Sequence, residues 1–215
     1  MSYIGSKPAN KAVVASDLDP TVITGQTALA VAPADTDEFI ISDAGVLKRL
    51  DASLVGGGGI TVAQQFRLLA DKAGGNSNGT VLTNWEESDT DYQAIGSAWS
   101  QSSGIFSTTS TGIYLCNWTL VTAGNTSGDA FDPNVQISTD SGSNYTTRSR
   151  VWGHVIPTVS HDTVATSFIF DVNNTSTFRL RFRESQDNDI STATTIKGGT
   201  AENYTQINFL RLGDT

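Results

Sequence analysis

The alternating stretch from Gly112 to Leu120 constrains the fold of this chain more than any other. Every second residue in it is apolar: Tyr114, Cys116, Trp118 and Leu120. The residues between them change from apolar Ile113 and Leu115 to polar Asn117 and Thr119. A period of two predicts a β-strand with one face in a core. We interpret Gly104–Phe106, followed by a polar turn at Ser110-Thr111, as the first half of a β-hairpin. Because a lone hairpin is marginal in water, further strands must complete the core.

Strand-like runs recur along the C-terminal part of the chain, separated by clusters of Ser, Thr, Asn, Asp and Gly. They are Val81-Leu82, Ile95–Trp99, Asn134–Ile137, Tyr145–Val155, Val164–Val172, Thr177–Phe182 and Gln206–Leu212. Roughly eight short strands at regular spacing predict an all-β fold, an antiparallel sandwich of the jelly-roll type. The composition agrees, with 38% hydrophobic and only 16% charged residues.

Breaks in composition divide the 215 residues into four parts. Residues 1–33 are small and polar and predict an extended attachment segment. Residues 34–59 predict a β-hairpin shaft or collar, turning at Ser42–Gly45 and ending in four consecutive glycines. Residues 60–78 are interpreted as a connector, in which Thr61–Ala73 is either a helix or the start of a strand. Residues 79–215 are then the jelly roll.

Charge and cysteine content exclude several classes of function. The net charge of −9 argues against a nucleic-acid partner, which requires clustered Lys and Arg. The single cysteine, Cys116, excludes an internal disulfide, and its place on the apolar face of a strand predicts a buried, inert thiol. No signal peptide or membrane-spanning segment is recognised, so we expect no membrane insertion.

No catalytic constellation or cofactor site emerges from the sequence. The acidic residues Glu86, Glu87, Asp89 and Asp91 resemble a carboxylate pair for glycoside hydrolysis, but they lie in a polar segment that we interpret as a solvated loop. His154 and His161 have no third ligand in a spaced motif, so we expect no metal site. We therefore predict that the chain is not an enzyme and binds no cofactor.

The candidate binding residues are basic and aromatic. Arg179, Arg181 and Arg183 share one face of a predicted strand, where they contact either an anionic sugar or acidic residues of a neighbouring strand or chain. Trp152 lies close in sequence to Arg148 and Arg150 and is a candidate for sugar stacking or an interface. Tyr92, Trp85 and Trp99 are further candidates for stacking, although most aromatic residues in strands belong to a core.

Several motifs resemble known families. GIFSTTSTGIYLCNWTL (104–120) and the terminal INFLRLGDT resemble strands of the tumour-necrosis-factor and complement C1q jelly-roll family. The order FRLLAD, an Asn-rich segment, IG, GIF, TGIY, FDV and FLRLGD is similar to C-terminal domains of marine bacteriophage structural proteins, where an isoleucine is commoner near the end. The start, MSYIGSKPANKAV, and ADTDEFIISDAGVLKRLDASLV are similar to N-terminal segments of tail-fibre proteins.

The resemblance implies a homotrimeric virion protein. It would be a tail fibre whose N-terminal segment, with Tyr3, Ile4, Val13 and Val14, anchors it to other virion proteins and whose jelly roll contacts a host glycan or protein. It would be made in the host cytoplasm and released by lysis. A capsid head fibre or decoration protein of the same architecture remains an alternative, as do a secreted C1q-like lectin and a depolymerase.

Overall fold

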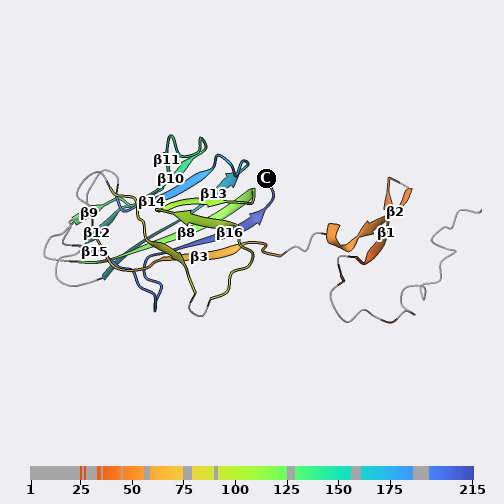
Figure 1. The fold of residues 1–215 in the computed structure, drawn as a ribbon, viewed down its shortest axis with the longest axis horizontal. Coiled ribbons are helices and arrows are strands. Elements are labelled where there is room, and N and C mark those ends of the chain that lie inside the picture. Colours follow the sequence, from red (N-terminus) through yellow and green to blue (C-terminus); the bar gives the residue numbers. More distant parts are fainter. Residues whose placement is uncertain are drawn as a thin grey trace, which may run out of the picture. The chain divides into compact units, whose positions relative to one another are not determined.

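The computed structural model describes residues 25, 27, 33–34, 36–44, 46–55, 59–74, 79–89, 92–124, 129–155, 161–185 and 194–215. They divide into two units, one before and one after the boundary between residues 58 and 59 (Figure 1). Within this part of the chain the regular structure is β, apart from one 3-10 turn, η2 (Ala52–Leu54). The all-β prediction is confirmed.

The N-terminal unit is a β-hairpin. Strands β1 (Glu38–Asp43) and β2 (Val46–Asp51) pair antiparallel, with Asp43 opposite Val46 at the turn. Arg49 and Glu38 form an ion pair of 2.9 Å across the two strands. The hairpin leaves Phe39 and Ile40 exposed, Ile40 at 83%, because two strands alone have no second layer to cover them. The hairpin predicted within residues 34–59 is confirmed.

The C-terminal unit is a sandwich of two large antiparallel sheets (Figure 1). One contains β4 (Lys72–Ala73), β15 (Thr195–Ile196), β8 (Gly112–Ala123), β16 (Gln206–Gly213), β3 (Ala63–Leu68) and β5 (Trp85–Glu87) in that order, with β13 (His161–Val172) paired to β8. The other contains β11 (Thr146–Arg150), β10 (Asn134–Ser138), β14 (Arg179–Arg183), β7 (Ile105–Thr108) and β6 (Trp99–Ser102). A two-stranded sheet, β9 (Asp129–Phe131) with β12 (Gly153–Val155), lies at one end (Figure 1).

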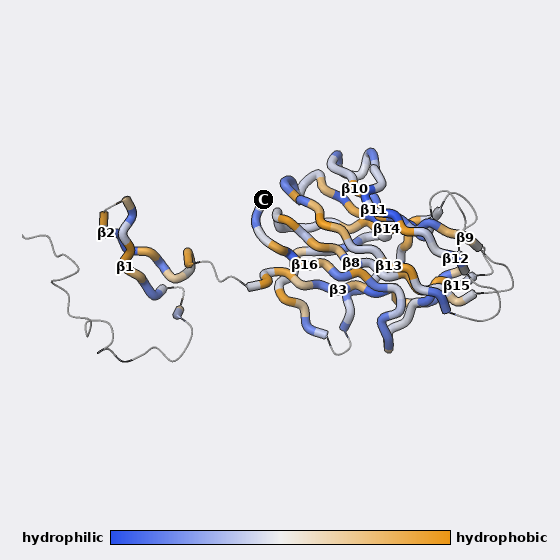
Figure 2. The backbone as a smooth tube through the Cα atoms, turned by 180° about the vertical axis from the view of Figure 1, so that it is seen from behind, coloured by the Kyte–Doolittle hydropathy of each residue, from blue (hydrophilic) through white to orange (hydrophobic). Residues whose placement is uncertain are grey.

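Strand β8 has the inward and outward faces that the alternation predicted. Tyr114, Cys116, Trp118 and Leu120 are buried, and the residues between them lie on the opposite face. Figure 2 shows β8 and β16 side by side in the sandwich, where they pair antiparallel, with hydrophobic stretches in both. Burial raises the pKa of the Cys116 thiol well above its ordinary value, which agrees with the predicted inert thiol.

The hairpin predicted for residues 104–120 is wrong. Strand β7 pairs with β6 and β14 in the five-stranded sheet, whereas β8 pairs with β13 and β16 in the other sheet. Residues 109–111 therefore carry the chain from one sheet to the other instead of turning it back within one. The tight hairpin is β6–β7, whose two turn residues, Ser103 and Gly104, both have positive φ angles, as a two-residue loop of this kind requires.

The prediction that residues 60–78 form a connector is also wrong. These residues supply β3 and β4 of the jelly roll, and the helix alternative for Thr61–Ala73 is wrong. Strand β3 lies between β16 and β5, so both of its edges are hydrogen-bonded. The compact unit accordingly begins at residue 59 and not at 79.

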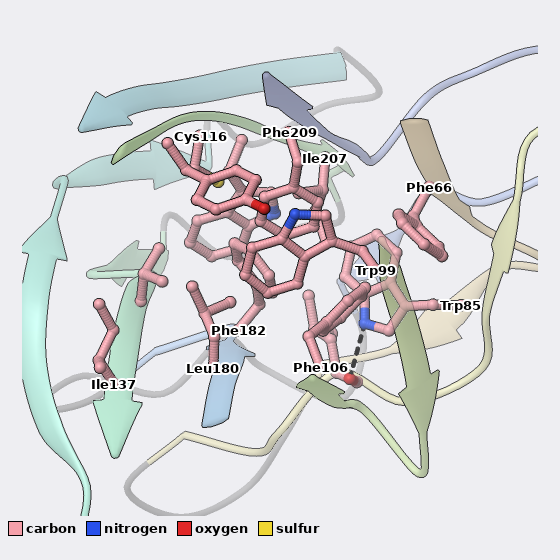
Figure 3. Close-up of a cluster of buried hydrophobic side chains, with 14 of the residues drawn as sticks. Phe66, Trp85, Trp99, Phe106, Cys116, Ile137, Leu180, Phe182, Ile207 and Phe209 are labelled. Carbon is pink, nitrogen blue, oxygen red and sulfur yellow. Dashed lines mark hydrogen bonds between the residues drawn. The ribbon is translucent and has the colours of Figure 1, made fainter. Parts of the chain in front are cut away.

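An aromatic core fills the space between the two large sheets (Figure 3). The rings of Phe209 and Trp99 stack at 4.2 Å between centroids, and Phe106 meets Phe66 edge-on at 5.2 Å. The indole N–H of Trp85 donates to the Leu82 carbonyl at 2.8 Å, which satisfies a buried donor. Contacts of this geometry add to the hydrophobic stabilisation of burial.

Candidate functional site

Strand β14 places its three arginines on one face, as predicted. Leu180 and Phe182 are fully buried in the core, so Arg179, Arg181 and Arg183 at the alternate positions lie on the outward face of the five-stranded sheet. The neighbouring strand β10 is in register, with Ser138, Gln136 and Asn134 opposite the three arginines in turn. We call the outward surface formed by Gln136, Tyr145, Arg150, Arg179, Arg181 and Arg183 the arginine face.

Arg181 is held by two neutral partners. Its Nε donates to Gln136 Oε1 at 2.7 Å, and its guanidinium carbon lies 3.8 Å from the centroid of the Tyr145 ring. Such a stack fixes the plane of a guanidinium. Burial lowers the pKa of Arg181, and the positive charge of Arg183 lowers it further, opposed by Tyr145. The main cause of the lowered pKa is therefore the partial burial of the guanidinium between its neighbours.

The other two arginines of β14 donate to backbone carbonyls. Arg179 Nη1 donates to the carbonyl of Phe178 at 2.6 Å and to that of Thr175 at 3.3 Å. Arg183 Nη2 donates to the Gly79 carbonyl at 2.6 Å. The sequence left open whether these side chains contact a ligand or protein. The hydrogen bonds show that both Arg179 and Arg183 contact the backbone of their own chain.

A compact turn supports Tyr145 beneath Arg181. Asp140 accepts hydrogen bonds from the Ser138 hydroxyl at 2.6 Å and from the backbone and side-chain amides of Asn144 at 2.9 and 2.7 Å. These donors lower the pKa of Asp140 to about 2. The turn also contains Gly142, where a Cβ would meet the Tyr145 hydroxyl at 3.2 Å. The turn therefore orders the residue that stacks on Arg181.

Trp152 lies at the end of the arginine face nearest Arg150. Its side chain is 68% exposed, and the guanidinium carbon of Arg150 is 5.8 Å from its ring centroid. Arg150 also forms an ion pair of 3.3 Å with the buried Asp132. Asn134 stands in register between Arg150 and Arg183, so the β14 arginines and the Arg150–Trp152 pair belong to one sheet face.

The other aromatic candidates for stacking occupy different surroundings. Trp85 and Trp99 are buried in the core, so neither can stack on a sugar. The Tyr92 hydroxyl bonds to the backbone of β3, accepting from the Gln65 amide at 2.6 Å and donating to the Ala63 carbonyl at 3.2 Å. Whether an aromatic side chain is buried or exposed depends on tertiary packing, so the sequence pattern could not distinguish Trp85 and Trp99 from the exposed Trp152.

Part of the acidic cluster pairs with a buried arginine that the sequence reasoning missed. Arg67 on β3 is 1% exposed and forms ion pairs with Glu86 at 2.7 Å and Asp89 at 2.5 Å. Glu86 belongs to strand β5, so the predicted solvated loop is wrong at this position. The sequence signal for this pair was the position of Arg67 between Phe66 and Leu68. An arginine among core residues is buried, and a buried arginine requires a carboxylate partner.

The described residues contain no candidate metal site and no helix that could span a membrane. In this part of the chain no three His, Cys, Asp or Glu side chains gather as a metal site would require. None of its helices has the length and apolar character needed to cross a bilayer. Tyr3, Ile4, Val13 and Val14, predicted to anchor the chain, lie outside the described residues.

A second uncovered surface lies on the outward face of the seven-stranded sheet. Four apolar residues from four adjacent strands stand side by side in register: Ile169, Leu115, Leu210 and Ala63. We call them the apolar row. Ile169 is 64% exposed, and exposed Ile113 stands beside Leu115 on the same face of β8. The next row is polar, with Gln65 donating to Asn208 at 2.7 Å.

Comparison with known proteins is informative for the fold. No protein-family model and no curated protein matches the sequence. The solved structure of Eiger TNF from S. frugiperda is similar, with a TM-score of 0.50 and 12% identity over 73% of this chain and 96% of that one. Murine APRIL has a TM-score of 0.47 and 13% identity over 70% and 98%. At this identity the likeness concerns the fold alone, and the C-terminal unit is an all-β jelly roll of the tumour-necrosis-factor type.

Proposed function

We propose that this chain is a noncatalytic structural protein of a bacteriophage virion, a homotrimeric tail fibre or appendage. Its N-terminal segment attaches to other virion proteins, and its jelly roll is presented to the host surface. The observation that carries the proposal is the apolar row, in which a single chain leaves Ile169 64% exposed and Leu115, Leu210 and Ala63 partly exposed. A contiguous apolar surface of this kind marks an interaction site.

The apolar row suits contact with further copies of the same chain. Ile169, Leu115, Leu210 and Ala63 form a strip across four strands, bordered by amide side chains that can hydrogen-bond at the rim of an interface. An apolar centre with a polar rim is the usual composition of a protein interface. The resemblance to trimeric jelly-roll proteins sets the expected number of copies at three.

The N-terminal unit supports an attachment role. The β1–β2 hairpin exposes Phe39, Ile40 and Val46, so it too has apolar side chains available to a partner. The order of motifs along the chain, from the MSYIGSKPANKAV start to the FLRLGD end, supports the virion setting. Three jelly rolls on one anchor would multiply weak contacts with a host surface through avidity.

Light scattering of the full chain tests the assembly. We expect a mass three times the 22.8 kDa of one chain. Ile169→Asp should yield monomers with unchanged circular dichroism, because a charge would be buried without a partner at the interface. Ser102→Asp, exposed on β6 of the other sheet, is the matched control and should remain trimeric. A monomeric wild type would refute the trimer, and a trimeric Ile169→Asp variant would remove the apolar row from the interface.

Gold labelling of a C-terminal tag on intact virions tests the location. Label at the tail is the expected result for a fibre that contacts the host. Label spread over the head would overturn the tail assignment in favour of a capsid fibre or decoration protein. Virions without label would refute the structural role.

A further inference from the structure

We propose that the arginine face binds an anionic saccharide, a chain that carries carboxylate or sulfate groups. This deepens the proposed host contact by naming the chemical class of its ligand, and it rests on that function for its biological setting. Arg181 is the centre of the site, with Arg179 beside it along the strand and Trp152 at the far end.

The charge on this face is only partly compensated within the chain. The protein has a net charge of −9, yet four of its 13 Lys and Arg residues, Arg150, Arg179, Arg181 and Arg183, lie on this one sheet face. Arg150 pairs with Asp132. Arg179 and Arg181, by contrast, bond to carbonyl and amide oxygens and have no carboxylate partner among the residues that the structure describes. Their positive charge is available to an anion.

The guanidinium groups are positioned before any ligand arrives. The Cα atoms of alternate residues in a strand are about 7 Å apart, so Arg179 and Arg181 present two cations from neighbouring positions on one strand face, each held by its own hydrogen bonds. Arg181 uses its Nε for Gln136 and its ring-facing side for Tyr145, which leaves the two Nη groups without a hydrogen bond among the described residues. A forked guanidinium held in this way binds carboxylate or sulfate with little loss of side-chain entropy.

Trp152 and the neutral polar residues favour a saccharide over other anions. An exposed indole offers an apolar surface for the face of a sugar ring. The Trp152 side chain is 68% exposed, so most of its surface is not packed against the jelly roll. The residues opposite these arginines on β10, Gln136 and Ser138, are neutral and buried, so they add no negative charge that would repel an anion from the face. The overall negative charge disfavours a polyphosphate chain such as nucleic acid.

The proposed trimer leaves this face free. The apolar row belongs to the seven-stranded sheet, whereas the arginine face is the outward side of the five-stranded sheet. The two surfaces are thus on different layers of the sandwich, and self-association through one does not cover the other. Three copies of the arginine face would be displayed by one trimer.

Binding of the full chain to four probes at about 50 mM salt tests the site: dextran sulfate, polygalacturonate, neutral dextran and a single-stranded DNA oligonucleotide. We expect one or both anionic polysaccharides to bind, more weakly at higher salt, and neutral dextran not to bind. Arg181→Gln should weaken binding about tenfold, the cost of losing one charged hydrogen bond. Arg181→Lys, which keeps the charge but loses the fork, should have an intermediate effect. Trp152→Ala should also weaken binding.

The matched control is Arg49→Gln, which removes one positive charge from the N-terminal hairpin. It should change affinity less than twofold. An equal loss in Arg49→Gln, or equal affinity for DNA, would overturn the site in favour of unspecific attraction between charges. No binding to either anionic polysaccharide would also overturn it. Light scattering of the same samples separates the two proposals, because a trimer that binds neither polysaccharide refutes the saccharide site and leaves the assembly intact.

Discussion

Truncation of Phe209 to alanine tests how the two sheets of the jelly roll are held together. Phe209 lies on β16 of the seven-stranded sheet and is fully buried. Its ring stacks on Trp99 of β6 at 4.2 Å and approaches Phe106 of β7 at 5.7 Å, both in the opposite sheet. Removing the ring loses its burial and these contacts and leaves a cavity, and such changes cost about 3–5 kcal/mol.

The expected consequence is a large fall in thermal stability. For a domain of this size, about 1 kcal/mol corresponds to roughly 2–4 °C in Tm, so a loss of about 4 kcal/mol lowers Tm by about 8–16 °C. Urea unfolding followed by tryptophan fluorescence, at one fixed protein concentration, measures the free energy of unfolding directly. Trp152→Ala removes a larger ring from an exposed position in the same unit and should cost no more than about 0.5 kcal/mol. A cost below about 1 kcal/mol for Phe209→Ala would refute the reasoning that this ring joins the sheets.

Two further predictions concern turns of the jelly roll. The pKa of Asp140 is about 2, below its ordinary 3.8, so its stabilising effect is present above pH 4 and is lost as the pH falls through 2. Asp140→Asn should therefore lower Tm at pH 7, and the difference from wild type should become much smaller in melts near pH 2, where the side chain is partly protonated in the folded protein. A constant difference would contradict the role of the charge. Gly104 has a φ of +80°, and a Cβ there would meet the Leu82 carbonyl oxygen at 2.3 Å. Gly104→Ala should cost about 1–3 kcal/mol in urea unfolding, and an unchanged midpoint would show that the β6–β7 turn can relax.

The candidate site shows how far a strand pattern can be read. The alternation of arginines with Leu180 and Phe182 was sufficient to predict that Arg179, Arg181 and Arg183 share the outward face. It was not sufficient to predict their partners, because Gln136 and Tyr145 come from a strand and a turn about 40 residues earlier. Those contacts depend on the register between β10 and β14, which is a property of the folded sheet.

The β3 region shows why local pattern can fail. Leu68, Leu69 and Ala70 follow one another without a polar residue between them, so the segment could be read as a helix or as the start of a strand. In the folded protein Arg67 is buried because Glu86 and Asp89 neutralise it from the β5 side of the sheet. A charge that is compensated by residues distant in sequence cannot be recognised as a core position from its neighbours alone.

The sequence by itself determined the all-β class and the inward and outward faces of β8 and β14, because side-chain direction in a strand follows from the period-two geometry of the backbone. Only the tertiary structure decided which strands pair. It separated β7 and β8 into different sheets, placed β3 beside β16, and left Trp152 exposed while burying Trp85 and Trp99. The physical reason is that pairing and burial depend on contacts between residues far apart in the chain, whose hydrogen bonds and packing leave no local trace in the sequence.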